Sequence, residues 1–144
     1  MNRYFEVGVR YDKTQEDGTA KKVTETYLID ALSFSEVEKR ITEEMEAYIS
    51  GDFSVVTEKI TNITDVVTTD DVLADKFYKV KFSIITFDEK TDKEKKKTQL
   101  IVIKASSNDD ARDRYKQYYK DTPVDLVLEA VSETKYIDYI PYKQ

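Results

Sequence analysis

The chain has 144 residues and a mass of 16.8 kDa, enough for one ordinary domain or two very small ones. Charged residues make up 36% of it and the formal net charge is −6, but 11 Tyr and 6 Phe are too many for a disordered chain. It contains no His, Cys or Trp, and this excludes disulfides, thiolate nucleophiles, Cys/His zinc sites and histidine bases.

Two alternating segments open the chain. Apolar and polar residues alternate over residues 4–11 and again over 23–30, which is the period of a half-buried strand. The polar segment 12–18 between them ends in Gly18, a residue that can take a positive φ. We therefore expect these two strands to form a β-hairpin.

The next segment carries the signals of a helix. Ser33 can cap its start, and Glu36 completes a capping box. Gly51 marks its end, and a third strand is expected over about residues 53–66. One apolar stripe at helical spacing would face the core, formed by Phe34, Val37, Ile41, Met45 and Tyr48.

The second half of the chain repeats the first. Four blocks align in the same order at offsets of 71 to 74 positions. The aligned blocks are 4–9 with 77–82, 21–31 with 95–105, 33–37 with 107–111, and 56–61 with 127–132. We interpret the pattern as a tandem duplication of a β-β-α-β unit, with repeat 1 over residues 3–67 and repeat 2 over residues 76–140.

The second repeat has the same helix signals. Ser107 with Asp110 forms the cap, and Pro123 limits the end of the helix. A third strand is expected over about residues 124–131, and residues 136–140 would extend it. The apolar stripe of this helix is formed by Ala111, Tyr115 and one of Tyr118 and Tyr119.

The strand connections predict the topology. A right-handed crossover through the helix makes strand three parallel to strand two, so strand three fits best beside strand one, in the order 2-1-3. Three strands and one helix would be marginally stable alone, so we expect both repeats to share a core as a pseudo-twofold pair. The expected fold is a single compact α+β domain over residues 1–144, with an antiparallel sheet of about six strands and both helices on one face. Two small layers packed face to face are the alternative.

Several segments carry a family resemblance. They are residues 21–25 (KKVTE), 27–34 (YLIDALSF), 49–53 (ISGDF), 87–90 (FDEK) and 138–142 (DYIPY). In these segments the chain resembles an uncharacterised family of short proteins from gut Bacteroides-type bacteria and their phages and mobile elements. The resemblance covers nearly the whole chain. It implies a role in the biology of such elements, but it brings no catalytic or binding residues with it.

Groups for catalysis or metal binding are sparse. Asp109 and Asp110 fall in the first turn of a helix, where negative charge offsets the helix dipole, and Asp70 and Asp71 fall in a linker. We therefore interpret neither pair as a magnesium site. The three glycines are scattered, and no phosphate-binding loop or serine nucleophile motif is present. We expect a protein that is not an enzyme and binds no cofactor or metal.

Tyrosines and carboxylates indicate a protein partner. The candidate partner surface consists of Tyr136, Tyr139 and Tyr142 near the C-terminus, and of Glu43, Glu44 and Glu46 on the solvent side of the first helix. The C-terminal tyrosines could pack on the sheet, join a homodimer or meet another protein. The leading expectation is a non-enzymatic interaction module that binds a host or mobile-element protein, for example as an inhibitor or a phage accessory protein.

The alternative is a protein that binds single-stranded nucleic acid through repeat 2. Its candidate residues are Lys90, Lys93, Lys95, Lys96 and Lys97, in an expected hairpin with aromatic residues nearby that could stack on bases. Intervening acids dilute this run, and the pI near 4.8 is far from that of a basic protein. A small ligand between the two halves is a third possibility without a supporting motif.

The chain shows no signal for export or membrane insertion. Arg3 and Glu6 put charge within the first six residues, without the apolar core of a signal peptide. No segment approaches the ~20 apolar residues of a membrane span. We therefore expect a cytoplasmic protein.

Overall fold

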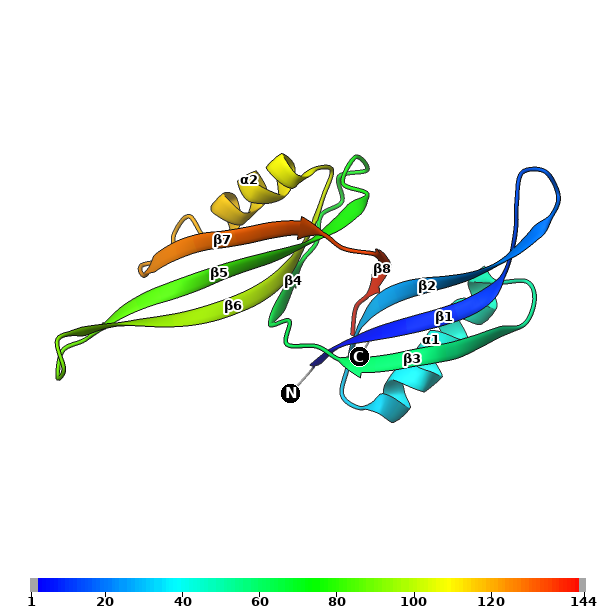
Figure 1. Ribbon diagram of the computed structural model, residues 1–144, viewed down its shortest axis with the longest axis horizontal. Coiled ribbons are helices and arrows are strands. Elements are labelled where there is room, and N and C mark those ends of the chain that lie inside the picture. The colour runs from blue at the N-terminus through cyan, green and yellow to red at the C-terminus, as the bar shows by residue number, and fades with distance from the viewer. Residues whose placement is uncertain (1–2, 143–144) are drawn as a thin grey trace. The chain divides into compact units, whose positions relative to one another are not determined.

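The computed structural model describes residues 3–142 and has an α+β fold with two helices and two sheets of four strands each. It divides into two compact units, which we call unit 1 (Met1–Asn62 with Lys135–Gln144) and unit 2 (Ile63–Thr134). Each unit holds one sheet and one helix (Figure 1).

Unit 1 is built around the long hairpin at the start of the chain. Its elements are β1 (Arg3–Thr14), β2 (Ala20–Ala31), α1 (Phe34–Tyr48), β3 (Phe53–Ile60) and β8 (Tyr136–Ile140). The strand order is β3-β1-β2-β8; β1 is antiparallel to β2 and β3, and β8 runs parallel to β2. Gly18, in the hairpin turn, has the expected positive φ of 86°.

Unit 2 has the same arrangement. Its elements are β4 (Asp65–Val67), β5 (Lys76–Asp88), β6 (Lys93–Ala105), α2 (Asn108–Tyr118) and β7 (Asp125–Glu133). The strand order is β4-β6-β5-β7, with β5 antiparallel to β6 and β7, and with β4 parallel to β6. The expected order 2-1-3 is thus found for β2-β1-β3 in unit 1 and for β6-β5-β7 in unit 2.

The expectation of one sheet of about six strands is wrong. The segment expected as one strand over residues 53–66 ends at Ile60 and resumes as β4, which pairs with β6 in unit 2. Likewise, residues 136–140 do not extend the third strand of repeat 2, because they form β8 and pair with β2 in unit 1. Each half of the sequence therefore supplies the fourth strand of the other unit's sheet.

A threonine marks the point where each third strand ends. The amide N and Oγ1 of Thr61 both donate to the carbonyl O of Tyr4, at 2.9 and 2.7 Å. The same two groups of Thr134 donate to the carbonyl O of Phe77, each at 2.8 Å. Because the fourth strands come from the opposite halves of the sequence, the units do not coincide with the expected repeats 3–67 and 76–140. The expectation of a single domain over residues 1–144 stays a prediction.

The two helix caps are confirmed. The Ser33 Oγ accepts the amide of Glu36 at 3.2 Å, and the Glu36 carboxylate accepts the amide of Leu32 at 3.0 Å. In unit 2, Ser107 accepts the amide of Asp110 at 3.0 Å, and Asp110 accepts the amide of Ser106 at 2.9 Å. In each helix, side-chain oxygens thus satisfy one free N–H group of the first turn and the N–H group just before the capping serine.

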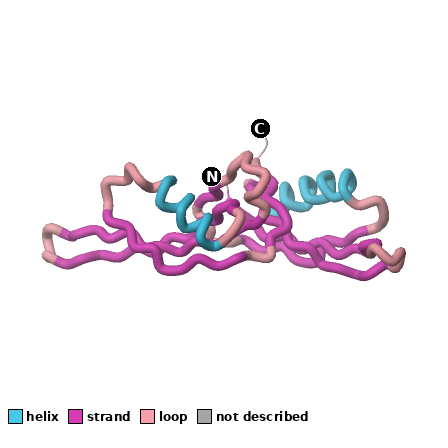
Figure 2. Tube along the Cα trace, turned by 90° about the horizontal axis from the view of Figure 1, so that it is seen from above, coloured by secondary structure: helices cyan, strands magenta, loops and turns pink. Residues whose placement is uncertain are grey.

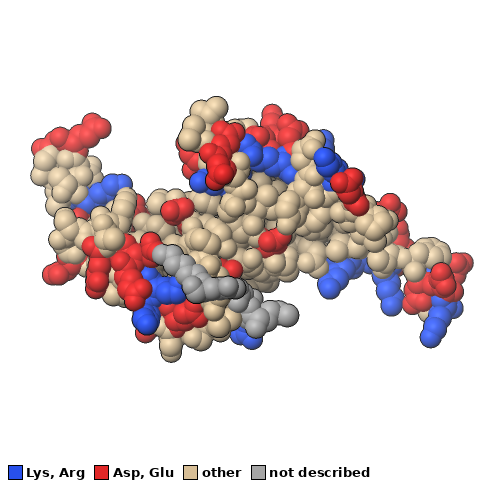
Figure 3. Space-filling model, turned by 180° about the vertical axis from the view of Figure 1, so that it is seen from behind, with Lys and Arg blue, Asp and Glu red and all other residues tan. Residues whose placement is uncertain are grey.

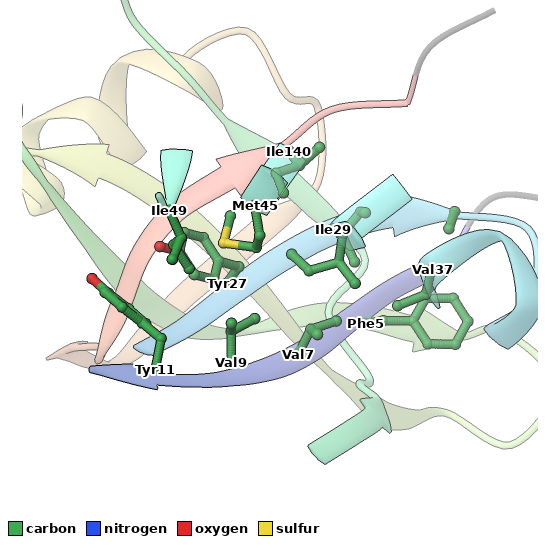
Figure 4. Packing of buried hydrophobic residues seen from close by; sticks show 12 residues of the cluster. Phe5, Val7, Val9, Tyr11, Tyr27, Ile29, Val37, Met45, Ile49 and Ile140 are labelled. Carbon is green, nitrogen blue, oxygen red and sulfur yellow. The ribbon is translucent and has the colours of Figure 1, made fainter. Parts of the chain in front are cut away.

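One helix covers one face of the sheet in each unit (Figure 2). In unit 1 the covered face is a cluster of buried side chains to which β1, β2, α1 and β8 all contribute (Figure 4). In unit 2 the ring of Phe82 packs against Tyr115 and Tyr119, with centroids 5.3 and 5.0 Å apart. Among the described residues, neither helix has the length and apolar character needed to cross a membrane.

Candidate functional site

The fourth strand of unit 1 creates a groove beside its helix. We call this feature the α1–β8 groove; its volume is about 160 Å³. It is lined by Tyr27 of β2, by Glu44, Met45 and Tyr48 of α1, and by Ile137, Asp138 and Ile140 of β8. Figure 4 shows Tyr27, Met45 and Ile140 converging from these three elements.

The lining residues differ in their exposure. Tyr27, Met45 and Ile140 are buried and form an apolar floor. Tyr48 and Ile137 lie at the rim and are 60% and 49% exposed. Large exposed apolar side chains beside an apolar hollow are typical of surfaces that bind partners.

A buried carboxylate, that of Glu25, accepts a hydrogen bond from Tyr27 of the groove. Glu25 accepts hydrogen bonds from the Oη of Tyr11 at 2.6 Å and of Tyr27 at 3.3 Å, and Lys13 Nζ lies 3.7 Å from its other oxygen. Burial, together with the charge of Glu25, raises the pKa of both tyrosines well above the ordinary value. Both hydroxyls therefore remain protonated and can donate to Glu25.

Arg40 holds the chain where it leaves β8. Its guanidinium donates to the carbonyl oxygens of Asp30 and Pro141, and it forms an ion pair with Glu36 at 3.2 Å. It also lies 5.8 Å from the ring centroid of Tyr142. Arg40 is not among the residues predicted from the sequence, where its only local signal is the i, i+4 spacing from Glu36.

The candidate tyrosines are used largely for packing. Tyr136 is buried and its Oη donates to Glu6; burial and this hydrogen bond raise its pKa well above the ordinary value. Tyr139 packs on Tyr4 with ring centroids 6.2 Å apart, and Tyr142 lies beside Arg40. The C-terminal segment therefore packs on the sheet of unit 1 as β8.

The three candidate glutamates do not all lie at the groove. Glu44 lines the α1–β8 groove, whereas Glu43 and Glu46 are exposed on α1 and are not part of its lining. The structure thus brings one of the three glutamates together with β8. That any of these residues contacts a partner stays a prediction.

Sequence reasoning missed most of the groove. Met45 and Tyr48 were assigned to the core-facing stripe of the helix, and Met45 is indeed buried while Tyr48 is not. Asp138 carried a signal that could have been used, because an aspartate is unusual in a strand. The groove itself depends on the pairing of β8 with β2, for which the sequence has no local signal.

The lysines of the β5–β6 hairpin do not form one basic surface. All five, Lys90, Lys93, Lys95, Lys96 and Lys97, are exposed. Successive residues of a strand point to opposite faces, so the three consecutive lysines cannot all share one face. Lys95 lies 3.3 Å from Asp88, and Lys96 lies 2.6 Å from Glu129. Figure 3 shows both signs of charge side by side at the tip of this hairpin.

Unit 2 also has a hollow between its helix and its fourth strand, but the charged residues of its lining are basic instead of acidic. Its volume is about 370 Å³ and it is lined by Val67, Thr68, Thr69, Lys104, Arg114, Gln117 and Tyr118. The hydroxyl of Tyr118 donates to Asp65 at 2.6 Å and ties α2 to β4. The two units therefore share a framework and differ in the chemistry beside the helix.

The acidic pairs have structural contacts. Asp71 accepts from Arg114 at 2.9 Å. The pKa of Asp110 is lowered by the amide of Ser106 and then by Arg114. Among the described residues, no three acidic side chains are grouped as ligands of a metal ion would be.

Comparison with known proteins supports the family resemblance. No curated protein and no solved structure matches the chain. One family model matches it over residues 3–142, which includes both units and the α1–β8 groove. The chain therefore belongs to the family described as "Domain of unknown function (DUF4494)".

Proposed function

We propose that this protein is a non-enzymatic interaction module that binds a protein of its host or of a mobile element through the α1–β8 groove. The observation that carries the proposal is the groove itself, with its apolar floor between a helix and an edge strand. The exposed rim residues Tyr48 and Ile137 support it, because aromatic and apolar side chains are enriched in the centre of protein interfaces.

The experiment compares two matched variants in capture of binding partners from host lysate. Ile137→Ser removes a rim residue of the groove, and Val127→Ser removes a residue of unit 2 that also lies in a strand and is 47% exposed. We expect Ile137→Ser to lose a partner that the wild-type protein and Val127→Ser both retain. Equal capture by all three proteins would contradict a role of the groove.

We also infer that the two halves of the sequence arose by tandem duplication of one β-β-α-β unit. Three pairs of equivalent contacts support this inference: the caps at Ser33 and Ser107, the strand ends at Thr61 and Thr134, and the helix arginines Arg40 and Arg114. Their spacing of 73 or 74 residues agrees with the offsets of the aligned sequence blocks.

Binding of single-stranded nucleic acid by the β5–β6 hairpin is the second candidate. It is favoured by Phe87, which is 63% exposed beside the lysines and could stack on a base. It is disfavoured by the charge of unit 2, which has 13 Lys and Arg against 15 Asp and Glu. Anisotropy of a labelled oligothymidine tests it: binding should weaken with salt and be lost when Lys95, Lys96 and Lys97 become Ala.

A further inference from the structure

We propose that the α1–β8 groove receives the side chain of an arginine from the partner protein. The arginine stem would lie on the apolar floor, and its guanidinium would meet the carboxylates of Glu44 and Asp138. This inference rests on the proposed protein-binding function and specifies the partner's chemistry.

The size of the groove favours a single side chain. Sites for small molecules and cofactors typically enclose ~300–1,000 Å³, whereas this groove holds about 160 Å³. Protein interfaces commonly gain most of their affinity from one or two side chains that enter pockets of this kind. An anchor residue of a partner therefore fits the available space better than a metabolite.

The lining combines apolar and acidic groups. Met45 and Ile140 supply aliphatic surface at the floor, while Glu44 and Asp138 supply carboxylates. One carboxylate oxygen of Asp138 accepts the amide of Tyr139 at 2.8 Å. Across residues 3–142, no Lys or Arg lies within ion-pair distance of the Asp138 carboxylate. A long cationic side chain matches this combination, because its stem is apolar and its end is charged.

The net charge of unit 1 is negative, like that of the two carboxylates in the groove. Unit 1 carries 14 Asp and Glu against 10 Lys and Arg. The helix beside the groove also exposes Glu43 and Glu46 to solvent. A cationic partner segment would be attracted to this face, and an acidic segment would be repelled.

The aromatic groups favour arginine over lysine. Tyr27 is part of the floor of the groove, and Tyr48 lies exposed at its rim. A planar guanidinium can stack on such rings and offer paired N–H donors to carboxylates at the same time. A lysine ammonium is a compact point charge without this fork of donors.

Methyl NMR of Met45 can test the inference directly. The chain contains two methionines, so labelling with [methyl-13C]methionine gives two signals, and Met45→Leu identifies the one in the groove. The probes are three blocked tripeptides, acetyl-Gly-X-Gly-amide, with arginine, citrulline or norleucine at X. We expect a saturable shift of the Met45 signal with arginine and at least a ~5-fold weaker affinity for citrulline, which keeps the shape but lacks the charge.

Matched variants separate the groove carboxylates from the overall charge. Asp138→Asn and Glu44→Gln should each weaken arginine binding by at least ~3-fold. Glu16→Gln removes the same charge from unit 1 at the exposed turn between β1 and β2, outside the groove lining, and it should leave binding unchanged.

Two results would overturn the inference. Equal or tighter binding of citrulline or norleucine would show that the groove does not select a positive charge, and the protein-binding function would still stand. A Met45 signal that moves with none of the three peptides would also reject the arginine. The capture comparison of Ile137→Ser with Val127→Ser tests the protein-binding function independently of this result.

Discussion

Arg40 and Arg114 occupy equivalent positions in α1 and α2, 74 residues apart, and each joins its helix to the segment that follows the unit's fourth strand. Arg40 contacts Glu36 of its own helix and the carbonyl of Pro141 after β8. Arg114 contacts Asp110 of its own helix and Asp71 after β4, each at 2.9 Å. Each arginine therefore links its helix to the chain just after the unit's fourth strand, β8 or β4, although the group contacted is a carbonyl at Pro141 and a carboxylate at Asp71.

Loss of Arg40 should destabilise the protein. Arg40→Met keeps much of the aliphatic stem but leaves the carbonyls of Asp30 and Pro141 and the Glu36 carboxylate without this donor. We expect the free energy of unfolding in urea to fall by about 2 kcal/mol. Lys39→Met, an exposed position on the same helix, is the control and should change it by less than ~0.5 kcal/mol. Equal effects of the two substitutions would reject the fastening role.

The exchanged strand should stabilise the unit in which it pairs. Ile140 lies in the second half of the sequence but is buried in the core of unit 1. Ile140→Ala should cost about 2–4 kcal/mol because it leaves a cavity there. Hydrogen exchange should become faster mainly in β1 and β2. Faster hydrogen exchange confined to β5 and β6 would contradict the assignment of β8 to the sheet of unit 1.

Gly8 allows close approach of β1 and β3. A Cβ at this position would lie 2.3 Å from Thr57 Oγ1, whereas a Cβ at Gly51 would meet nothing within 4 Å. Gly8→Ala should therefore cost about 1 kcal/mol, because Thr57 must leave its rotamer or the strands must shift. Gly51→Ala provides the control.

A double-mutant cycle can check whether Thr57 causes the loss of stability in Gly8→Ala. In a Thr57→Ala background, Gly8→Ala should cost much less, since the colliding oxygen is absent. A cost that is the same in both backgrounds would mean that Thr57 is not the obstacle.

The carboxyl of Glu58 should make stability depend on pH. Its pKa is raised, first by burial and then by the neighbouring carboxylate of Glu38. Because the folded pKa lies above the unfolded one, the ionised group destabilises the fold at neutral pH. That destabilisation disappears as the pH falls through the folded pKa and then below the ordinary value of 4.5.

Glu58→Gln should consequently raise the urea midpoint at pH 7 and have little effect near pH 4. Glu46→Gln, at an exposed position of α1, is the matched control and should show no comparable gain. A gain for Glu58→Gln that is equal at both pH values would rule out ionisation as its cause.

Local signals in the sequence were sufficient for most elements. Alternation predicted β1 and β2, and the capping residues Ser33 and Ser107 predicted where both helices begin. The destination of the chain after Thr134 could not be predicted, because the parallel pairing of β8 with β2 joins residues more than 100 positions apart. A pairing of that kind leaves no pattern within either segment.

The candidate site was predicted less well than the fold for the same reason. Glu44 and the C-terminal segment were both singled out, but as separate features of the surface. Their convergence beside Met45 requires β8, from the second half of the sequence, to join unit 1. The tyrosines drew attention to the correct segment, although Tyr136 proves to be buried and bonded to Glu6.

The most direct test of the central claim is site-specific photo-crosslinking in the host cell. A photoreactive phenylalanine analogue would replace Tyr48 at the rim of the α1–β8 groove or Tyr118 on α2, two helix tyrosines that are 60% and 50% exposed. Binding through the groove predicts a discrete crosslinked protein at position 48 and none of that size at position 118. No crosslink at position 48, or the same product at both positions, would contradict the claim.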